Sequence, residues 1–344
     1  MAHFRVRHVQ RRARKFFFAL SATANESTTI RKQSFIDESQ QRTQMLQRAH
    51  VKTNRAVCRE HFVMSLTLPR FRAATPGQFV HLAADGEVNA NGANTSPSGQ
   101  GFAAPFLRRA FSIAGCRHAS DAVEIDVLYR TVGVGTNWLA SLQPGDAVSV
   151  MGPLGNGFAP PDSKSRALLV AGGVGLPPLL WLAQTVTARG GFALGVSGAV
   201  SADLVAVPSA QAVSTIDDLR MAIEGTPSPQ DSSPPWLIAT DDGSRGFHGN
   251  AVDALRAVYD RFGSSLAGWT VYTCGPEAMM RAVSEFCGKQ SIPSFACMER
   301  AMSCGTGTCQ SCVVALDDDQ DSQGWRYHLC CTDGPVFDSS RLRW

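Results

Sequence analysis

Five cysteines near the C-terminal end constrain this sequence more than any other feature. Three fall within nine residues and an adjacent pair follows: Cys304, Cys309, Cys312, Cys330 and Cys331. The spacing C-x4-C-x2-C with a distant fourth cysteine is typical of plant-type [2Fe–2S] ligands. Gly305 and Gly307 let the loop backbone pass close to inorganic sulfides, because they carry no Cβ. The pattern therefore predicts an electron-transfer protein.

Two other interpretations of these cysteines are weaker. Buried free cysteines are common, but three of them interleaved with glycines fill a core poorly. Structural zinc sites usually contain two C-x2-C pairs, and only Cys309 and Cys312 form one here. Because Cys330 and Cys331 are neighbours, we expect only one of them to reach the iron, and the spacing does not choose between them.

The overall composition is that of a globular protein with several cores. With 344 residues, 44% hydrophobic and 18% charged, the chain can form two or three domains. A net charge of +3 gives no reason to expect a nucleic-acid partner. No apolar run reaches 18 residues, so we expect no membrane span. Ten cysteines in a chain of this length do not indicate a disulfide scaffold. Their cluster-like spacing predicts a reducing compartment, hence a cytoplasmic protein.

Residues 1–44 differ from the rest of the chain. They are rich in arginine and lysine, and the first acidic residue is Glu26. An organellar transit peptide or a twin-arginine signal shares these features. The apolar stretch that follows the basic residues is short, so we expect a disordered extension, or translation that begins at Met45.

Residues 45–160 are predicted to form a small antiparallel β-barrel. Short segments rich in β-branched and aromatic residues alternate with Gly, Pro and Asp turns, at 62–68, 79–82, 111–114, 123–129 and 147–151. Within this region, residues 85–104 are loaded with Gly, Asn, Ser and Ala, which is typical of a surface insertion.

Strands and helices alternate in residues 161–290. We expect strands at 167–171, 194–197, 236–240 and 269–273, and helices at 179–187, 251–262 and 277–287. This alternation predicts a doubly wound parallel sheet with helices on both faces. Residues 291–344 then form a small cluster domain, so the predicted fold class is α/β plus all-β.

A glycine turn follows the first strand of the α/β region. Gly172, Gly173 and Gly175 stand at a strand-to-helix junction, where backbone N–H groups and the helix dipole favour a phosphate. The turn does not match G-x-G-x-x-G, and such glycines also permit simple close packing. We expect it to approach a nucleotide because it lies between a barrel and a cluster.

Two segments of the barrel region resemble the flavin-binding signature of the ferredoxin reductase superfamily. They are Arg109-Ala110-Phe111-Ser112, and Leu128-Tyr129-Arg130 followed by Gly133-Val134-Gly135-Thr136. The resemblance implies that the first segment holds the flavin ring and phosphate, while Gly135 and Thr136 cradle the pyrophosphate of FAD. An arginine fork and nearby hydroxyl and N–H donors suit an anion. Ala110 replaces the usual proline.

Further motifs resemble the family of electron-transfer subunits of dihydroorotate dehydrogenase B. They occur in the expected order at Thr75–Val80, Gly152–Phe158, Thr240–Ser244, Cys274-Gly275-Pro276, Glu299-Arg300 and Cys331–Phe337. The resemblance spans about residues 49–337. It selects Cys331 as the fourth ligand, because the family's cysteine stands two residues before Asp-Gly-Pro.

The resemblance implies an oxidoreductase subunit with three cofactors. FAD lies at the barrel, NAD enters the doubly wound domain beside Cys274-Gly275-Pro276, and the [2Fe–2S] cluster lies between FAD and a catalytic partner subunit that oxidises dihydroorotate. Two copies of each chain form a heterotetramer. We assign no general base, because hydride transfer needs none. We interpret Asp241 and Asp242 as part of a structural loop.

Two other functions fit the same residues. One is a related NAD(P)H-dependent reductase that serves a hydrogenase, a sulfide-metabolising enzyme or a ferredoxin. The other is a non-enzymatic redox sensor, which would show negligible NADH oxidation. The segment Gly198–Asp203 contains no arginine for a 2′-phosphate, which favours NAD over NADP.

Overall fold

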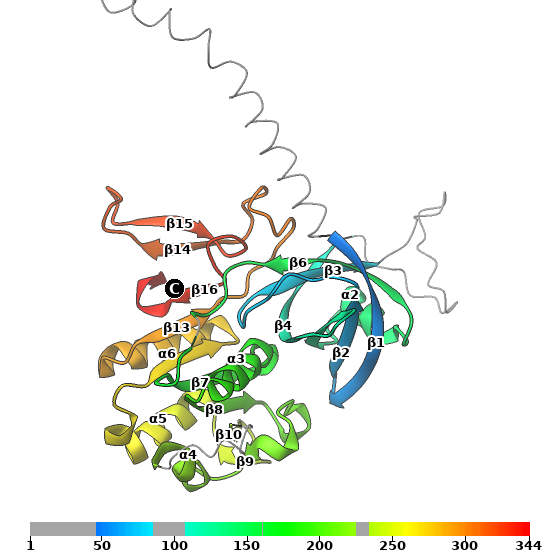
Figure 1. Cartoon of the computed structure of the whole chain (residues 1–344). Coiled ribbons are helices and arrows are strands. Elements are labelled where there is room, and N and C mark those ends of the chain that lie inside the picture. Colours follow the sequence, from blue (N-terminus) through cyan, green and yellow to red (C-terminus); the bar gives the residue numbers. More distant parts are fainter. Residues whose placement is uncertain (1–45, 85–106, 160, 225–233) are drawn as a thin grey trace, which may run out of the picture. The chain divides into compact units, whose positions relative to one another are not determined.

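A six-stranded antiparallel barrel forms the N-terminal part of the computed structural model, which describes residues 46–84, 107–159, 161–224 and 234–344. Its strands are β1 (Leu46–Cys58), β2 (His61–Leu68), β3 (Phe79–Ala84), β4 (Arg109–His118), β5 (Val123–Arg130) and β6 (Ala147–Leu154). They close in the order β1-β2-β5-β4-β3-β6 (Figure 1). The expected extension 1–44 and the whole of the expected insertion 85–104 lie outside the described residues, so neither is tested.

The barrel core follows the period-two pattern of its strands. On β2, Met64, Leu66 and Leu68 are fully buried, as alternation predicts for a strand with one face inward. The helix α2 (Val134–Ser141) adds Trp138 and Leu139 to this core. The strand β1 was not delimited from the sequence, because it is mostly exposed and polar and so carries little hydrophobic signal.

A mainly parallel sheet follows the barrel. Its strands are β7 (Arg166–Gly172), β8 (Phe192–Ala199), β10 (Trp236–Thr240), β11 (Phe247–His248), β12 (Thr270–Cys274), β13 (Ser294–Cys297) and β16 (Val336–Asp338), and β9 (Ala212–Val213) pairs with β10. Only β16 runs antiparallel, at the edge beside β13. Although β13 lies beyond the boundary expected at residue 290, it pairs with β12 in this sheet.

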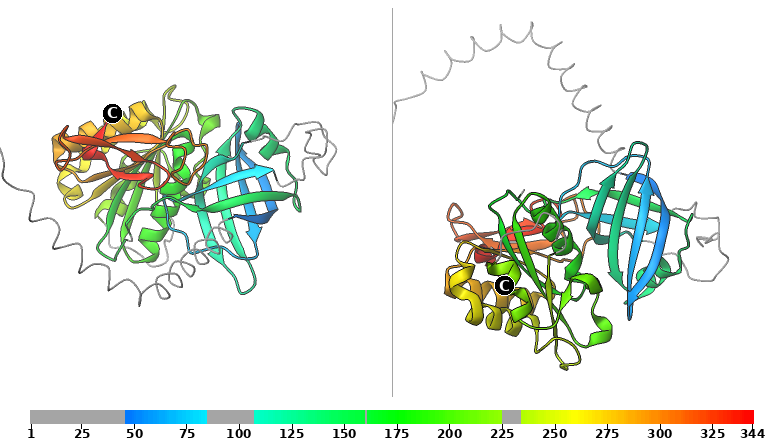
Figure 2. Two further views of the ribbon diagram at one scale, coloured as in Figure 1. Left: turned by 90° about the horizontal axis from the view of Figure 1, so that it is seen from above. Right: turned by 60° about the horizontal axis from the view of Figure 1, so that its bottom comes forward.

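Helices cover both faces of this sheet, as predicted. They are α3 (Leu176–Ala188), α4 (Arg220–Glu224), α5 (Ala251–Phe262) and α6 (Glu277–Gln290). On β7, Leu168 and Val170 pack in the core beneath α5 and α6, whereas Leu169 and Ala171 pack beneath α3. Figure 2 shows α3 on the side of the sheet nearer the barrel strands. Its Trp181 packs against the barrel core.

The C-terminal residues form a third, smaller sheet. The strands β14 (Val313–Asp317), β15 (Trp325–Leu329) and β17 (Leu342–Arg343) pair antiparallel in the order β15-β14-β17. Short 3-10 turns occur at Gly173–Gly175, Ala202–Leu204, Ser209–Gln211, Asp217–Leu219, Gly263–Leu266 and Ser339–Arg341. In the described ranges no helix has the length and apolar character needed to cross a membrane.

The small sheet is tied to the barrel through Asn156. The backbone N–H of Asn156 donates to the carbonyl of Gly334 over 2.6 Å. Its side-chain Nδ2 donates to the carbonyls of Thr332 and Asp333 over 3.0 and 3.2 Å. Asn156, the second residue after β6, therefore holds the segment that follows Cys331, and so fixes the cysteine region against the barrel.

Candidate functional site

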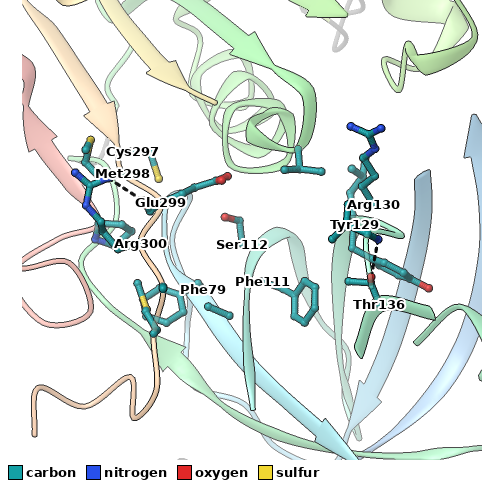
Figure 3. A pocket seen from close by; sticks show the side chains of 17 residues that line it. Phe79, Phe111, Ser112, Tyr129, Arg130, Thr136, Cys297, Met298, Glu299 and Arg300 are labelled. Carbon is teal, nitrogen blue, oxygen red and sulfur yellow. Dashed lines mark hydrogen bonds between the residues drawn. The ribbon is translucent and has the colours of Figure 1, made fainter. Parts of the chain in front are cut away.

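A cavity of about 530 Å³ opens between the barrel and residues 297–302. One wall comes from β4, β5 and α2, and consists of Ala110, Phe111, Ser112, Leu128, Tyr129, Arg130 and Thr136. All seven belong to the two segments that resemble a flavin signature. Figure 3 shows Phe111, Ser112 and Tyr129 on one side of this space, with Glu299 and Arg300 opposite. The fold thus gathers two segments that are separate in the sequence into one wall.

The aromatic part of this wall is rigid. The rings of Phe111 and Tyr129 meet edge to face with centroids 6.1 Å apart, and Phe62 stacks on Tyr129 at 5.7 Å. The Tyr129 hydroxyl donates to Asn54 Oδ1 over 2.9 Å, and burial raises its pKa. This part of the wall is therefore an apolar surface that suits a large flat ring system, and the ring contacts and the Tyr129 hydrogen bond hold it in place.

The start of α2 places N–H groups and a guanidinium beside this wall. The Thr136 hydroxyl accepts from the backbone N–H groups of Val132 and Gly133 over 2.8 and 3.2 Å, which fixes the turn. Arg109 lies directly over Gly135, since a Cβ on that glycine would fall 2.3 Å from Arg109 Nε. Neither Arg109 nor Gly135 lines the cavity itself. A guanidinium above a helix N-terminus attracts phosphate.

The opposite wall comes from the residues just before the loop 304–312, which is called the cysteine loop below. Glu299 faces into the cavity (Figure 3), and burial raises the pKa of its carboxyl group. Arg300 Nη1 donates to Glu277 over 2.8 Å, and its Nε donates to the carbonyl of Val313 over 3.4 Å. In the sequence, Glu299 and Arg300 were recognisable only as a family motif, and their place in a cavity was not predicted.

A second cavity, of about 520 Å³, lies at the carboxyl ends of the parallel strands. Gly172 and Gly173 line it after β7, Pro276 after β12, and Asp241 after β10. Crevices at this edge are where open α/β sheets bind ligands. Asp241, which was interpreted from the sequence as part of a structural loop, lines this cavity. Arg130 lines both cavities, and its guanidinium is held by Glu60 Oε2 at 2.6 Å.

The glycines beside this second cavity have separable roles. A Cβ on Gly175 would fall 2.2 Å from the carbonyl oxygen of Cys274, so this glycine allows the turn to pack on the Cys-Gly-Pro loop. Gly275 has φ +151° and sits against Gly172. Gly173, with φ +52°, has open space around its Cβ position. Gly175, Cys274 and Gly275 do not line the cavity, and Cys274 is fully buried.

The cysteine loop has the backbone that its glycines require. Gly305 and Gly307 adopt φ +70° and +82°, the left-handed region that glycine tolerates best. Backbone N–H groups of Thr306 and Cys309 both donate to Cys304 Sγ over 3.4 Å. Although burial opposes ionisation, these two donors lower the pKa of the Cys304 thiol to about 6. The loop is therefore built to hold a thiolate.

The thiols of the cysteine region form two pairs. The backbone N–H of Cys309 donates to Cys304 Sγ, and that of Cys331 donates to Cys312 Sγ, both over 3.4 Å. Within the described ranges, no three His, Cys, Asp or Glu side chains are arranged to hold a single metal ion. A [2Fe–2S] cluster divides four thiolates between two irons, so two pairs of thiols fit it.

The adjacent Cys330 and Cys331 point to different places. Cys330 Sγ donates to the carbonyl of Met298 over 3.2 Å, its side chain is fully buried, and burial raises its pKa. The thiol of Cys331 instead lies beside Cys312 and receives a hydrogen bond from the backbone N–H of Gly307. Of the two, only Cys331 faces the loop.

The cysteine loop begins at the wall of the first cavity. Ala301 and Met302 line that cavity, and Cys304 follows two residues later. Two residues span at most about 7 Å. A group held by Cys304 is therefore within a short electron-transfer distance of a ligand in the cavity.

Comparison with known proteins places this architecture in a class. The solved NADH-dependent reduced ferredoxin-NADP oxidoreductase aligns with a TM-score of 0.65 at 22% identity, over 86% of this chain and 90% of that one. The Amycolatopsis cytochrome P450 reductase GcoB aligns with a TM-score of 0.51 at 24% identity, over 71% and 66%. A sequence model of the iron-sulfur cluster binding domain of dihydroorotate dehydrogenase B matches residues 299–343. The fold is ferredoxin-reductase-like, with an added cluster-binding domain.

Sequence relatives identify the family. The dihydroorotate dehydrogenase B (NAD(+)) electron transfer subunit of Geobacillus kaustophilus is 36% identical over 266 residues, which cover 76% of this chain and 84% of that one. The subunit of Desulforamulus reducens is 32% identical over 273 residues, covering 79% and 88%. This chain belongs to the family of dihydroorotate dehydrogenase B electron transfer subunits, as its motifs predicted.

Proposed function

We propose that this protein carries electrons from dihydroorotate, oxidised on a separate catalytic subunit, through a [2Fe–2S] cluster and FAD to NAD+. The proposal rests mainly on the fact that the three sites adjoin one another. The second cavity, proposed for NAD, and the first cavity, proposed for FAD, share Arg130. Residues that line the first cavity lead directly into the cysteine loop. When bound, FAD exchanges two electrons with the nicotinamide and single electrons with the cluster.

The barrel residues bind and orient FAD. Phe111 and Tyr129 give the isoalloxazine ring an apolar surface, and Ser112 supplies a hydroxyl at its edge. Ala110, Leu128 and Arg130 complete that wall. Arg109, over Gly135 at the start of α2, neutralises the pyrophosphate, and Thr136 holds the turn in which the helix N–H groups face it.

The carboxyl edge of the parallel sheet binds NAD. Gly173 leaves room for a phosphate at the turn before α3, and Gly175 with Cys274-Gly275-Pro276 holds that turn in place. Arg256 also lines this cavity, but Asp253 lies 3.2 Å from its guanidinium and offsets its charge. That pairing favours NAD over NADP, since a 2′-phosphate needs an available cation.

The four loop-facing cysteines, Cys304, Cys309, Cys312 and Cys331, ligate the cluster. Backbone N–H donors to the sulfur of Cys304 stabilise its thiolate before metal arrives. Metal binding requires deprotonated cysteine, so a preformed thiolate environment favours loading. The contacts within each pair support a cluster in which Cys304 and Cys309 would hold one iron and Cys312 and Cys331 the other.

The partner is a dihydroorotate-oxidising catalytic subunit, in a heterotetramer with two copies of each chain, in the cytoplasm. All ten cysteines are free thiols, which suits a reducing compartment. The family name itself denotes a subunit, and a cluster at the end of the relay must meet an electron donor.

Anaerobic co-expression with the dihydroorotate-oxidising chain tests this function. We expect dihydroorotate-dependent reduction of NAD+ only when both chains are present, together with a flavin absorbance spectrum and the paramagnetic signal of a reduced [2Fe–2S] cluster. Loss of both cofactor signals would contradict the relay. Intact NADH-dependent dye reduction without dihydroorotate activity would contradict the assigned partner and leave the reductase.

A further inference from the structure

His81 is a buried polar side chain without a partner. It lies on β3, in the middle of the barrel wall, and its exposed fraction is 0%. Neither ring nitrogen has a hydrogen-bond partner among the residues that the structure describes. Leaving a buried donor unsatisfied costs free energy, so such a group in a native fold requires an explanation.

The ring of His81 packs against the cysteine loop. A Cβ placed on Gly305 would fall 2.8 Å from His81 Cε1 and 3.0 Å from its Nε2. Gly305 directly follows Cys304, and its φ of +70° is one that a side chain would strain. The glycine therefore lets the loop come into contact with an imidazole that belongs to the flavin-binding barrel.

The other neighbours of the ring offer it no acceptor. Phe79 lies 5.7 Å away between ring centroids, and Leu154 Cδ1 also approaches the Cβ position of Gly305, at 3.1 Å. Burial, with a smaller contribution from Arg108, lowers the pKa of His81 to about 4, so the ring is neutral at pH 7. A neutral imidazole carries one N–H donor.

We propose that His81 donates its ring N–H to a sulfur of the iron–sulfur centre held by the Cys304 loop, and so raises the reduction potential of that centre. Hydrogen bonds to cluster sulfurs are one of the protein's means of setting this potential. His81 is a positioning residue that links the flavin barrel to the cluster. The inference rests on the proposed cluster site.

The first test compares reduction potentials in the holoprotein. In His81→Leu we expect the cluster to form, and the equilibrium constant for its one-electron reduction to fall roughly threefold to tenfold, the magnitude of one net hydrogen bond. His81→Gln, which keeps an N–H donor, should recover part of that change. Leu154→Val is the matched control, because it alters packing on the same glycine without removing a donor.

The outcomes distinguish an effect of the His81 hydrogen bond on the cluster potential from an effect of packing. An unchanged cluster potential in His81→Leu, or an equal change in Leu154→Val, would overturn the proposal. A wild-type protein without the reduced-cluster signal would instead contradict the proposed cluster itself. Flavin potentials should stay the same in every variant.

A second measurement begins with the wild-type protein. Wild-type protein labelled with nitrogen-15 histidine should show a histidine nitrogen coupling in pulsed paramagnetic resonance of the reduced cluster. His328 follows the loop on β15, so the coupling must persist in His328→Gln and disappear in His81→Gln or His81→Leu. Absence of any histidine coupling in the wild-type protein would overturn the proposal even if every His81 variant failed to fold.

Discussion

At the scale of single residues, two neighbouring cysteines make a matched experiment. Cys331→Ser should abolish the normal cluster spectrum, because its thiol lies beside Cys312 in the loop. Cys330→Ser should retain the cluster and lose only about 1 kcal/mol of unfolding free energy, because the Cys330 thiol donates a hydrogen bond to the carbonyl of Met298 in the core. Absorbance and paramagnetic resonance of both variants measure this. Equal cluster loss in the two would show that the assignment to Cys331 is wrong.

Two glycines at the start of α2 also differ by one contact. In Gly135→Ala the new methyl group displaces Arg109, since the Cβ position lies 2.3 Å from Nε. FAD affinity should fall about tenfold to hundredfold, the value of a charge-assisted contact. Gly133→Ala is the control, because its Cβ position has nothing within 4 Å. Flavin released on dilution is the readout, and equal release from both variants would contradict the role of Arg109.

At the scale of elements, the turn between β7 and α3 depends on close packing. Gly175→Ala would place a Cβ 2.2 Å from the carbonyl oxygen of Cys274, where both sides are backbone. Overpacking of this kind costs about 1–3 kcal/mol, and the shifted turn should weaken NAD binding. Thermal unfolding and NADH titration measure the two effects. Unchanged values for both would show that the turn accommodates a methyl group.

In helix α6 we expect a glycine-to-alanine substitution to raise stability instead of lowering it. Gly288 lies within the helix, and its Cβ position has no atom within 4 Å. Gly288→Ala should therefore raise the unfolding free energy by about 0.5–1 kcal/mol, because alanine loses less backbone entropy on folding. Denaturant unfolding checks the sign. A decrease would mean that the residue has a packing role on its exposed side that these contacts do not reveal.

At the scale of the whole molecule, Asn156 holds the cluster region against the barrel. Asn156→Ala removes the donors to Thr332 and Asp333, and should reduce stability by about 1 kcal/mol. Both cofactors should still bind, but electron transfer from flavin to cluster should slow. Rapid-mixing reduction with NADH, followed at flavin and cluster wavelengths, separates these steps. A wild-type rate in Asn156→Ala would show that its backbone bond to Gly334 suffices.

The class of the protein was available in the sequence because local chemistry encodes it. A two-iron cluster needs closely spaced thiols and glycines, so it can be predicted from one short segment that contains Cys304, Gly305 and Cys309. The strands and helices of the parallel sheet followed from periodicity, because one face of each must be buried. The exposed strand β1 escaped delimitation for the same reason, since it buries little.

What the tertiary structure alone decided concerns residues far apart in the chain. The contact between His81 and Gly305 joins positions 224 apart in sequence, and Glu299 meets the flavin wall only because the chain returns to the barrel. The orientations of Cys330 and Cys331 depend on what surrounds each thiol, which spacing does not specify. A sequence records local propensity and ligand spacing, whereas burial and partnership across elements arise only when the chain folds back on itself.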